Sequence, residues 1–262
     1  MIRFSHEEGM IKPDGIIKLD GTHDINYKLP HIAIGVFSEY LLADIVQKFS
    51  CEKVGAIGCA NCKRPVYIMK YKDVEFTLFM AGISGPWISS DIEQLSVHGV
   101  DTFIIFGNCG VLDKSIEDCS IIIPNKAFRD EGTSYHYMTE SDWVELNPKY
   151  TDVFKQILKE NNYEFFEGAT WTTDGFFRET REKVKYFKEQ GAVCVEMEGA
   201  CIAAVCKYKN LDYFTFYYAE DNMDAIEWDE RSLNQLTNFE KKKLVPYLAF
   251  ELARKISDIR GC

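Results

Sequence analysis

The fold of this chain is decided by the stretch Val193-Cys194-Val195-Glu196-Met197-Glu198-Gly199-Ala200-Cys201-Ile202-Ala203-Ala204-Val205. Its apolar start predicts a buried strand that ends at the two glutamates, and its small residues predict a closely packed helix. Ligands of open α/β sheets bind at the carboxyl edge of the strands. The pattern therefore favours a ligand site at Glu196 and Glu198. The alternative is two solvated acids at a helix N-terminus, where the helix dipole favours negative charge.

The hexapeptide Val195-Glu196-Met197-Glu198-Gly199-Ala200 resembles the VEMEGA signature of the purine nucleoside and uridine phosphorylase superfamily. Three more segments are similar to family motifs in the same order, namely a glycine-rich turn, a second glycine loop and a base-pocket segment: Ala81-Gly82-Ile83-Ser84-Gly85-Pro86, Gly107-Asn108-Cys109-Gly110-Val111-Leu112 and Thr173-Asp174-Gly175-Phe176-Phe177. The resemblance covers roughly residues 30 to 258. It implies a three-layer α/β/α sandwich around a mixed, curled central sheet.

Length and composition indicate one domain. The 262 residues are 46% hydrophobic, with no linker-like or repetitive tract, so residues 1–29 are interpreted as an irregular arm and residues 30–262 as a single domain. The net charge of −11 argues against a nucleic acid polymer as partner. No apolar run approaches the roughly 20 residues of a membrane helix, and the charged N-terminus does not resemble a signal peptide.

Cysteine usage indicates a reducing compartment. Nine cysteines, an odd number scattered among apolar positions, are typical of buried free thiols, which favours the cytoplasm. The pair Cys59 and Cys62 has CxxC spacing but no further cysteine or histidine nearby to complete a zinc site. Neither a metal nor an organic cofactor is expected.

Hydrophobic periodicity and turn residues predict the order of strands and helices. Strands are expected at 31–36, 53–58, 65–71, 74–80, 101–106, 119–124, 165–170 and 213–218, and helices at 39–49, 89–98, 148–161 and 239–256. Ser38 is expected to cap the first helix. Residues 125–143 are interpreted as a long irregular segment, and Pro246 as a kink or a first turn of the last helix.

The resemblance also implies roles for individual side chains. The sugar would be bound by Glu198, Met197 and His6, the last reaching a neighbouring subunit, although an inert exposed His6 is the alternative. The base would be bound by Phe176, which stacks on it, with Glu196 and Arg178. Glu220 or Asp221 would be the acid that protonates the leaving base. The anion loops would contribute Gly35, Ser84, Gly107 and Asn108.

Two positions depart from the family pattern. Glu39 and Ile105 stand where the family has phosphate-binding arginines, and a carboxylate repels an oxyanion. Three functions therefore stay open: phosphorolysis of a nucleoside, hydrolysis of the same bond, and non-catalytic nucleoside binding or storage. Residues 178–182 do not match the family's uracil-binding pattern, so purine and pyrimidine both remain open. The expected partners are a nucleoside, inorganic phosphate and further copies of the chain.

Overall fold

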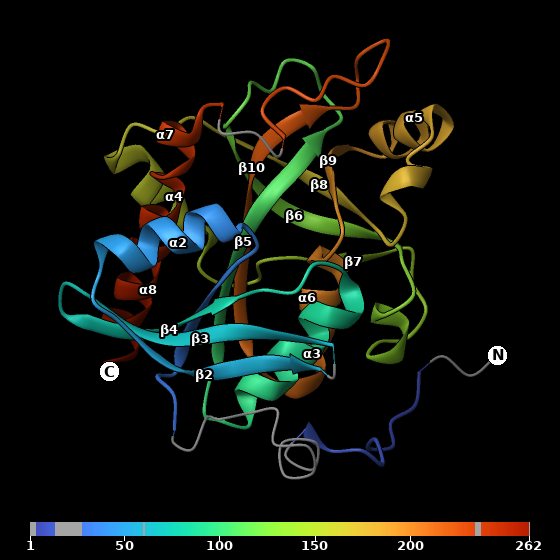
Figure 1. Ribbon diagram of the computed structural model, residues 1–262. Helices are drawn as coiled ribbons and strands as arrows, with labels where there is room; N and C mark the ends of the chain where they lie inside the picture. The colour runs from blue at the N-terminus through green and yellow to red at the C-terminus, as the bar shows by residue number, and fades with distance from the viewer. Residues whose placement is uncertain (1–3, 14–27, 60, 234–236, 262) are drawn as a thin grey trace.

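The computed structural model describes residues 4–13, 28–59, 61–233 and 237–261 (Figure 1). The ten strands of these residues form one mixed sheet with helices on both faces. The strands are β1 (Ile32–Val36), β2 (Cys51–Cys59), β3 (Cys62–Tyr71), β4 (Val74–Met80), β5 (Thr102–Val111), β6 (Ile121–Asp130), β7 (Trp143–Glu145), β8 (Phe165–Thr173), β9 (Ala192–Glu196) and β10 (Asp212–Asn222). The helices are α2 (Glu39–Lys48), α3 (Gly85–Ser96), α4 (Thr151–Glu160), α5 (Arg181–Glu189), α6 (Gly199–Lys209), α7 (Phe239–Lys242) and α8 (Val245–Arg260), with short 3₁₀ turns η1 (Ser134–His136) and η2 (Phe176–Arg178).

The sheet is curled so strongly that five of its strands form a closed ring. Strand β10 pairs in parallel with β5 and antiparallel with β6, while β9 pairs in parallel with β8 and antiparallel with β5. Strands β6 and β8 pair in parallel and complete the ring. The predicted curled mixed sheet is therefore confirmed. Strands β1, β4, β3 and β2 extend the sheet from β5 as an open wing.

Two apolar layers cover the faces of the sheet. Alternate side chains of β5 point to opposite faces, so Ile104 and Phe106 enter one core and Phe103 and Ile105 enter the other. The first core is completed by α2, α4 and α8, and the second by α3 and α6. This arrangement confirms the predicted three-layer sandwich, with α5 set apart beside β8 and β9 (Figure 1).

The strand predicted at 31–36 and the helix predicted at 39–49 are confirmed as β1 and α2. The predicted cap of α2 is also confirmed, since the Ser38 hydroxyl accepts a hydrogen bond from the Leu41 amide at 3.3 Å. Three expectations were wrong. Residues 125–143 are not wholly irregular, because β6 continues to Asp130, and the expected loop 107–110 lies within β5. The last helix is divided into α7 and α8, and Pro246 lies in the first turn of α8, where a missing amide hydrogen is tolerated.

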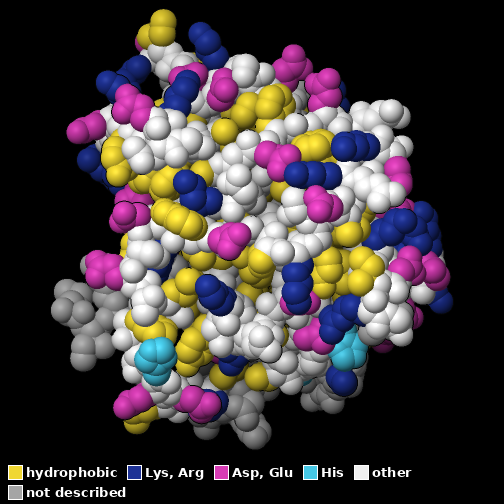
Figure 2. Space-filling model, turned by 180° about the vertical axis from the view of Figure 1, so that it is seen from behind, with side chains coloured by type: hydrophobic (Ala, Val, Ile, Leu, Met, Phe, Trp, Pro, Cys, Tyr) yellow, Lys and Arg dark blue, Asp and Glu magenta, His cyan; other side chains and the backbone are white. Residues whose placement is uncertain are grey.

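The surface carries charges of both signs. Figure 2 shows basic and acidic side chains interspersed with small hydrophobic patches on the face opposite to that of Figure 1. Among the described residues, no helix combines the length and apolar character needed to cross a membrane.

A buried asparagine helps to close the ring between β6 and β10. Only two residue pairs join β10 to β6 directly. Beyond these pairs, the side-chain amide nitrogen of Asn147 donates to the carbonyl of Pro124 in β6 at 2.9 Å and to that of Thr215 in β10 at 2.7 Å. Its oxygen accepts from the Thr215 amide at 2.8 Å. Asn147 therefore replaces backbone pairing where the two strands separate.

We expect Asn147→Ala to lower the free energy of unfolding by about 2–4 kcal/mol, because it leaves three buried backbone groups without partners. The matched control is Asn161→Ala, which removes one hydrogen bond from an exposed helix end and should cost less than about 1 kcal/mol. Urea denaturation of both variants measures the difference. Equal small losses would show that Asn147 does not hold the ring closed.

Candidate active site

The turn between β9 and α6 is organised by the carboxylate of Glu196. It accepts hydrogen bonds from the backbone amides of Glu198 at 2.7 Å and Gly199 at 2.5 Å. It also accepts from the hydroxyls of Thr172 at 2.6 Å and Thr170 at 3.1 Å, both on the neighbouring strand β8. Glu196 is buried, and burial raises its pKa while these four donors lower it. All four donors to Glu196 belong to the protein, so the contact of Glu196 with a nucleoside base stays a prediction.

Glu198 is held differently. Its carboxylate accepts a hydrogen bond from the Ser84 amide at 2.5 Å, across the sheet edge, and a longer one from the Met197 amide at 3.3 Å. Glu198 is buried, and this burial, together with the nearby charge of Glu196, raises its pKa to about 8. Two N–H donors leave oxygen lone pairs unused, which a ligand's hydroxyl groups can fill.

Ser84 makes this contact in a strained backbone conformation. Its φ of 92° and ψ of 156° are rare for a residue with a side chain and cost about 1–3 kcal/mol. The neighbouring Gly82 amide donates to the buried Asp91 at 2.8 Å, and Asp91 is bound by both terminal nitrogens of Arg64 at 2.6 and 2.5 Å. These bonds anchor the loop before α3. The strained Ser84 amide is thereby directed at Glu198.

The two candidate acids of β10 point to opposite sides, as successive strand residues do. Glu220 forms a buried ion pair with Lys242 of α7. Asp221 instead accepts a hydrogen bond from the Trp228 indole at 2.8 Å and lies over Gly110 of β5. Burial is the largest influence on both residues and raises both pKa values. Asp221 faces the strand ends that carry Glu196, whereas Glu220 faces α7.

The predicted base-stacking aromatic lies on an open rim. Phe176 is 53% exposed in η2, and its ring centroid lies 3.9 Å from that of Phe177, which is also exposed. The following Glu179 is half-buried, and burial, with the charge of Asp221 as a second cause, raises its pKa to about 8. Sequence reasoning missed Glu179 and Trp228. Its only signal for Glu179 was the position two residues after the aromatic pair.

The remaining predicted residues lie as follows. Arg178 is exposed at the end of η2, Met197 is half-buried between the two acids, and exposed His6 packs edge-on against Phe4 at 4.8 Å. Asn108 is half-buried in β5 beside Tyr218. Gly35 and Gly107 lie inside β1 and β5, where an added Cβ would lie 2.7 Å from the rings of Phe79 and Phe37 respectively. For these glycines the structure gives a packing reason.

The buried Arg64 and Arg129 form internal hydrogen bonds, although Nε of Arg64 and one terminal nitrogen of Arg129 have no hydrogen-bond partner within the described part of the chain. Arg64 is paired with Asp91, and Arg129 donates to the Ser134 hydroxyl, the Thr139 carbonyl and the Ser141 hydroxyl, each at 2.7 Å. Ile105 is fully buried in the α3 and α6 core. Glu39 lies exposed in the first turn of α2.

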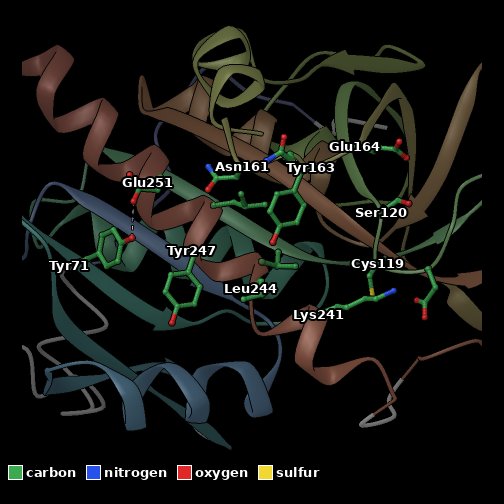
Figure 3. Close-up of a pocket in the computed structure, with 14 residues that line it drawn as sticks. Tyr71, Cys119, Ser120, Asn161, Tyr163, Glu164, Lys241, Leu244, Tyr247 and Glu251 are labelled. Atoms are coloured by element: carbon green, nitrogen blue, oxygen red, sulfur yellow. Dashed lines mark hydrogen bonds between the residues drawn. The ribbon is translucent and has the colours of Figure 1, made fainter. Parts of the chain in front are cut away.

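A separate cavity of about 640 Å³ lies on the α4, α7 and α8 side of the molecule. Figure 3 shows Tyr163, Tyr247 and Leu244 pointing towards it, while the Tyr71 hydroxyl donates to Glu251 at 2.8 Å. Its lining includes none of the site residues predicted from the sequence. The two sites are therefore distinct.

The family model described as "Phosphorylase superfamily" matches residues 31–244. The chain belongs to this superfamily. A guanosine phosphorylase of Halorubrum lacusprofundi is 30% identical over 144 residues, which cover 54% of this chain and 58% of that protein. A uridine phosphorylase of Thermococcus kodakarensis is 32% identical over 108 residues, which cover 41% and 39% of the two proteins. The chain thus spans less than two thirds of the length of either relative.

Two further relatives of this phosphorylase-superfamily chain align over most of its length. A 5'-methylthioadenosine/S-adenosylhomocysteine nucleosidase of Buchnera aphidicola is 26% identical over 204 residues, covering 74% of this chain and 83% of that protein. The structure of a purine nucleoside phosphorylase from Toxoplasma gondii in complex with immucillin-H superimposes with a TM-score of 0.72 at 17% identity, covering 87% and 93% of the chains. The superposition shows the shared fold.

The raised pKa of Glu198 predicts a pH-dependent stability. The folded-state pKa of about 8 exceeds the ordinary value of 4.5, so this residue's contribution is fully present below pH 4.5 and is lost as the pH rises towards 8. Glu198→Gln carries no titrating group. The free energy of unfolding of the variant minus that of the wild type should therefore rise by up to about 1.4 kcal/mol per pH unit between pH 4.5 and 8. Above pH 8 this difference should stay constant.

Urea denaturation at several pH values between about 5 and 9 measures this difference. The exposed Glu164→Gln is the control and should differ from the wild type by the same amount at every pH. A constant difference for Glu198→Gln as well would show that the Glu198 pKa is ordinary.

Proposed function

We propose that the chain cleaves the N-glycosidic bond of a ribonucleoside. The observation that carries the proposal is the buried Glu198 carboxylate, which accepts a hydrogen bond from the strained Ser84 amide. Asp221 lies at the same edge of the sheet. Membership of the phosphorylase superfamily supports it, as do relatives named phosphorylases and nucleosidases.

Glu198 would bind the 2'- and 3'-hydroxyls of the ribose. Charge-assisted hydrogen bonds contribute roughly 1.5–3 kcal/mol each. As the glycosidic bond breaks, the sugar gains positive charge, and a preorganised anion beside it stabilises that charge. Met197, between the two acids, would pack against the sugar. Phe176 would stack on the base, since its ring is open on the rim.

Asp221 is the better candidate for the acid that protonates the leaving base. Burial raises the pKa of Asp221, which favours its protonated form, and its carboxyl group lies on the side of the candidate site. Glu220 is neutralised by Lys242 and lies on the opposite side of β10. We assign Glu220 a structural role at the base of α7.

The second substrate separates the two candidate reactions. Phosphorolysis is the reaction that the family name implies. Hydrolysis is favoured by the exposed Glu39 and the buried Ile105, which supply no cation at the two positions where the family has phosphate-binding arginines. Simple nucleoside binding is the third candidate. We further propose that the chain works as a homo-oligomer in the cytoplasm, consistent with the eight free cysteines among the described residues.

Variants of the two acids test the assignment on β10. Asp221→Asn should lower kcat/KM at least tenfold for a nucleoside whose base needs protonation, because an amide cannot donate the acid proton. Glu220→Gln should leave kcat/KM within about threefold of the wild type, although it should lower stability by leaving the buried Lys242 charge without its carboxylate partner. Base release followed by absorbance, with Tm measured in parallel, distinguishes these effects. A larger catalytic loss in Glu220→Gln would reverse the assignment.

A phosphate titration tests the reaction itself. We expect wild-type base release from a ribonucleoside to proceed without added phosphate and to yield free ribose, because Glu39 and Ile105 stand where the family has phosphate-binding arginines. Glu198→Gln should lose at least tenfold in kcat/KM, and the exposed control Glu164→Gln should lose nothing. Saturation by phosphate with a sugar 1-phosphate product would establish phosphorolysis instead. Ribonucleoside binding without any base release would indicate a binding protein.

A further inference from the structure

The two cysteines with CxxC spacing differ from the other described thiols in their exposure. Eight free cysteines lie in the described part of the chain, and of these only Cys59 and Cys62 are exposed. Two others are half-buried and four are buried. We propose that Cys59 and Cys62 form a site of reversible oxidation, at which a low-molecular-weight disulfide converts the two thiols into one intramolecular disulfide. The proposed cleavage of a nucleoside uses neither thiol.

The hairpin of β2 and β3 places the two cysteine side chains on one face. Cys59 ends β2, Cys62 begins β3, and the two residues are direct partners in antiparallel register. Partners of this kind point to the same face of a sheet, and their Cα atoms lie about 4.5–5.5 Å apart. A disulfide requires Cα atoms roughly 4.4–6.8 Å apart. The register therefore permits a disulfide without separation of the strands.

Contacts with α3 hold the hairpin in this register. The Gly58 amide donates to the side-chain oxygen of Gln94 at 3.2 Å. On the other strand, Arg64 is bound to Asp91 by both of its terminal nitrogens. The strands also approach closely, since a Cβ added at Gly58 would lie 2.1 Å from the Cys62 carbonyl oxygen. The cysteine that follows Gly58 and the one that precedes Arg64 by two residues are thus positioned for each other before any oxidant arrives.

Burial separates most of the other described thiols from this chemistry. The thiolate is the nucleophile in thiol–disulfide exchange, and burial in apolar surroundings disfavours it. Burial raises the pKa of Cys51, at the opposite end of the hairpin, and raises that of Cys119 to about 11. It also raises the pKa values of three fully enclosed thiols, those of Cys109, Cys201 and Cys206. A dissolved disulfide therefore meets the exposed pair first.

The exchange consists of two balanced steps. The thiolate of one cysteine attacks a sulfur of the added disulfide, which forms a mixed disulfide and releases one thiolate of the reagent. The second cysteine attacks the protein sulfur of this mixed disulfide, which closes the bond between Cys59 and Cys62 and releases the second reagent thiolate. Two protein thiols are oxidised and one reagent disulfide is reduced. The two cysteine protons go to the released thiolates. An excess of reduced reagent reverses both steps.

Mass spectrometry of the full-length folded protein tests the site. The protein is equilibrated at about pH 8, where thiolates form, with mixtures of reduced and oxidised glutathione, and the remaining thiols are then alkylated. Peptide mapping should find a disulfide between Cys59 and Cys62, with mixed disulfides of either residue roughly tenfold or more less abundant. Added reduced glutathione should restore both thiols.

Single substitutions separate the pair from two independent thiols. Cys59→Ser and Cys62→Ser should each accumulate a stable mixed disulfide with glutathione at the remaining cysteine, because no second thiol displaces the reagent. Cys51→Ser is the control, since Cys51 lies in the same hairpin but pairs with Met69 at its other end. This variant should form the same intramolecular disulfide as the wild type, over the same range of glutathione ratios.

Stable mixed disulfides at both Cys59 and Cys62 of the wild type, without the bond between them, would overturn the inference. Disulfides that join separate protein molecules through these residues would also overturn it. So would faster oxidation of another described cysteine, or exposed thiols that stay reduced in excess oxidised glutathione. The readout is a covalent bond in the wild-type protein. It is therefore independent of base release and of the folding of any variant.

Discussion

The rest of the site depends on the four hydrogen bonds accepted by the Glu196 carboxylate. Two come from amides at the start of α6 and two from threonines of β8, so one buried side chain fixes a turn and joins two parallel strands. The turn has no space for a side chain at Gly199, where a Cβ would lie 2.6 Å from the Tyr217 hydroxyl and 2.9 Å from a Glu196 oxygen. Glu198 lies within this turn, immediately before α6. Its position is thus set by the residue two places earlier.

The acids of the candidate site present acceptors that suit a cationic or hydrogen-donating ligand. Three of its acids, Glu198, Asp221 and Glu179, have raised pKa values for which burial is the largest cause. Perturbed carboxyl groups and a strained residue such as Ser84 reduce stability, and such features concentrate where a protein needs preorganised chemistry. A sugar that becomes positive and a base with N–H donors both fit these acceptors. By contrast, Glu39 and Ile105 supply no positive charge for an oxyanion at the two positions where the family has arginines.

The sequence predicted the layers and the strand edge because these depend on local patterns. The apolar run before Glu196 and the small residues after Glu198 correctly predicted β9 and α6. The division of roles between paired acids could not be predicted, since it depends on which way each carboxylate points after folding. Glu220 and Asp221 are adjacent in sequence yet face α7 and the site respectively.

Long-range contacts explain the other differences. Trp228 reaches Asp221 from an irregular loop, and no periodic pattern marks it. Strand β6 continues to Asp130 because β8 pairs with it there, although its own residues mix aromatics and charges without clear alternation. The last expected helix is interrupted at Lys243 and Leu244, between the end of α7 at Lys242 and the start of α8, which has Pro246 in its first turn. Each of these features is decided by a partner distant in sequence.

The central claim is that the Glu198 carboxylate binds the ribose diol. The most direct measurement is a ¹³C NMR titration of the Glu198 carboxyl, assigned by comparison with Glu198→Gln, in the free protein and with a saturating ribonucleoside. The account predicts a pKa of about 8 in the free protein and a clear decrease in the complex, because two hydroxyl donors stabilise the ionised form. The corresponding 2',3'-dideoxynucleoside should cause no decrease. A pKa that is the same with and without the ribonucleoside would contradict the account.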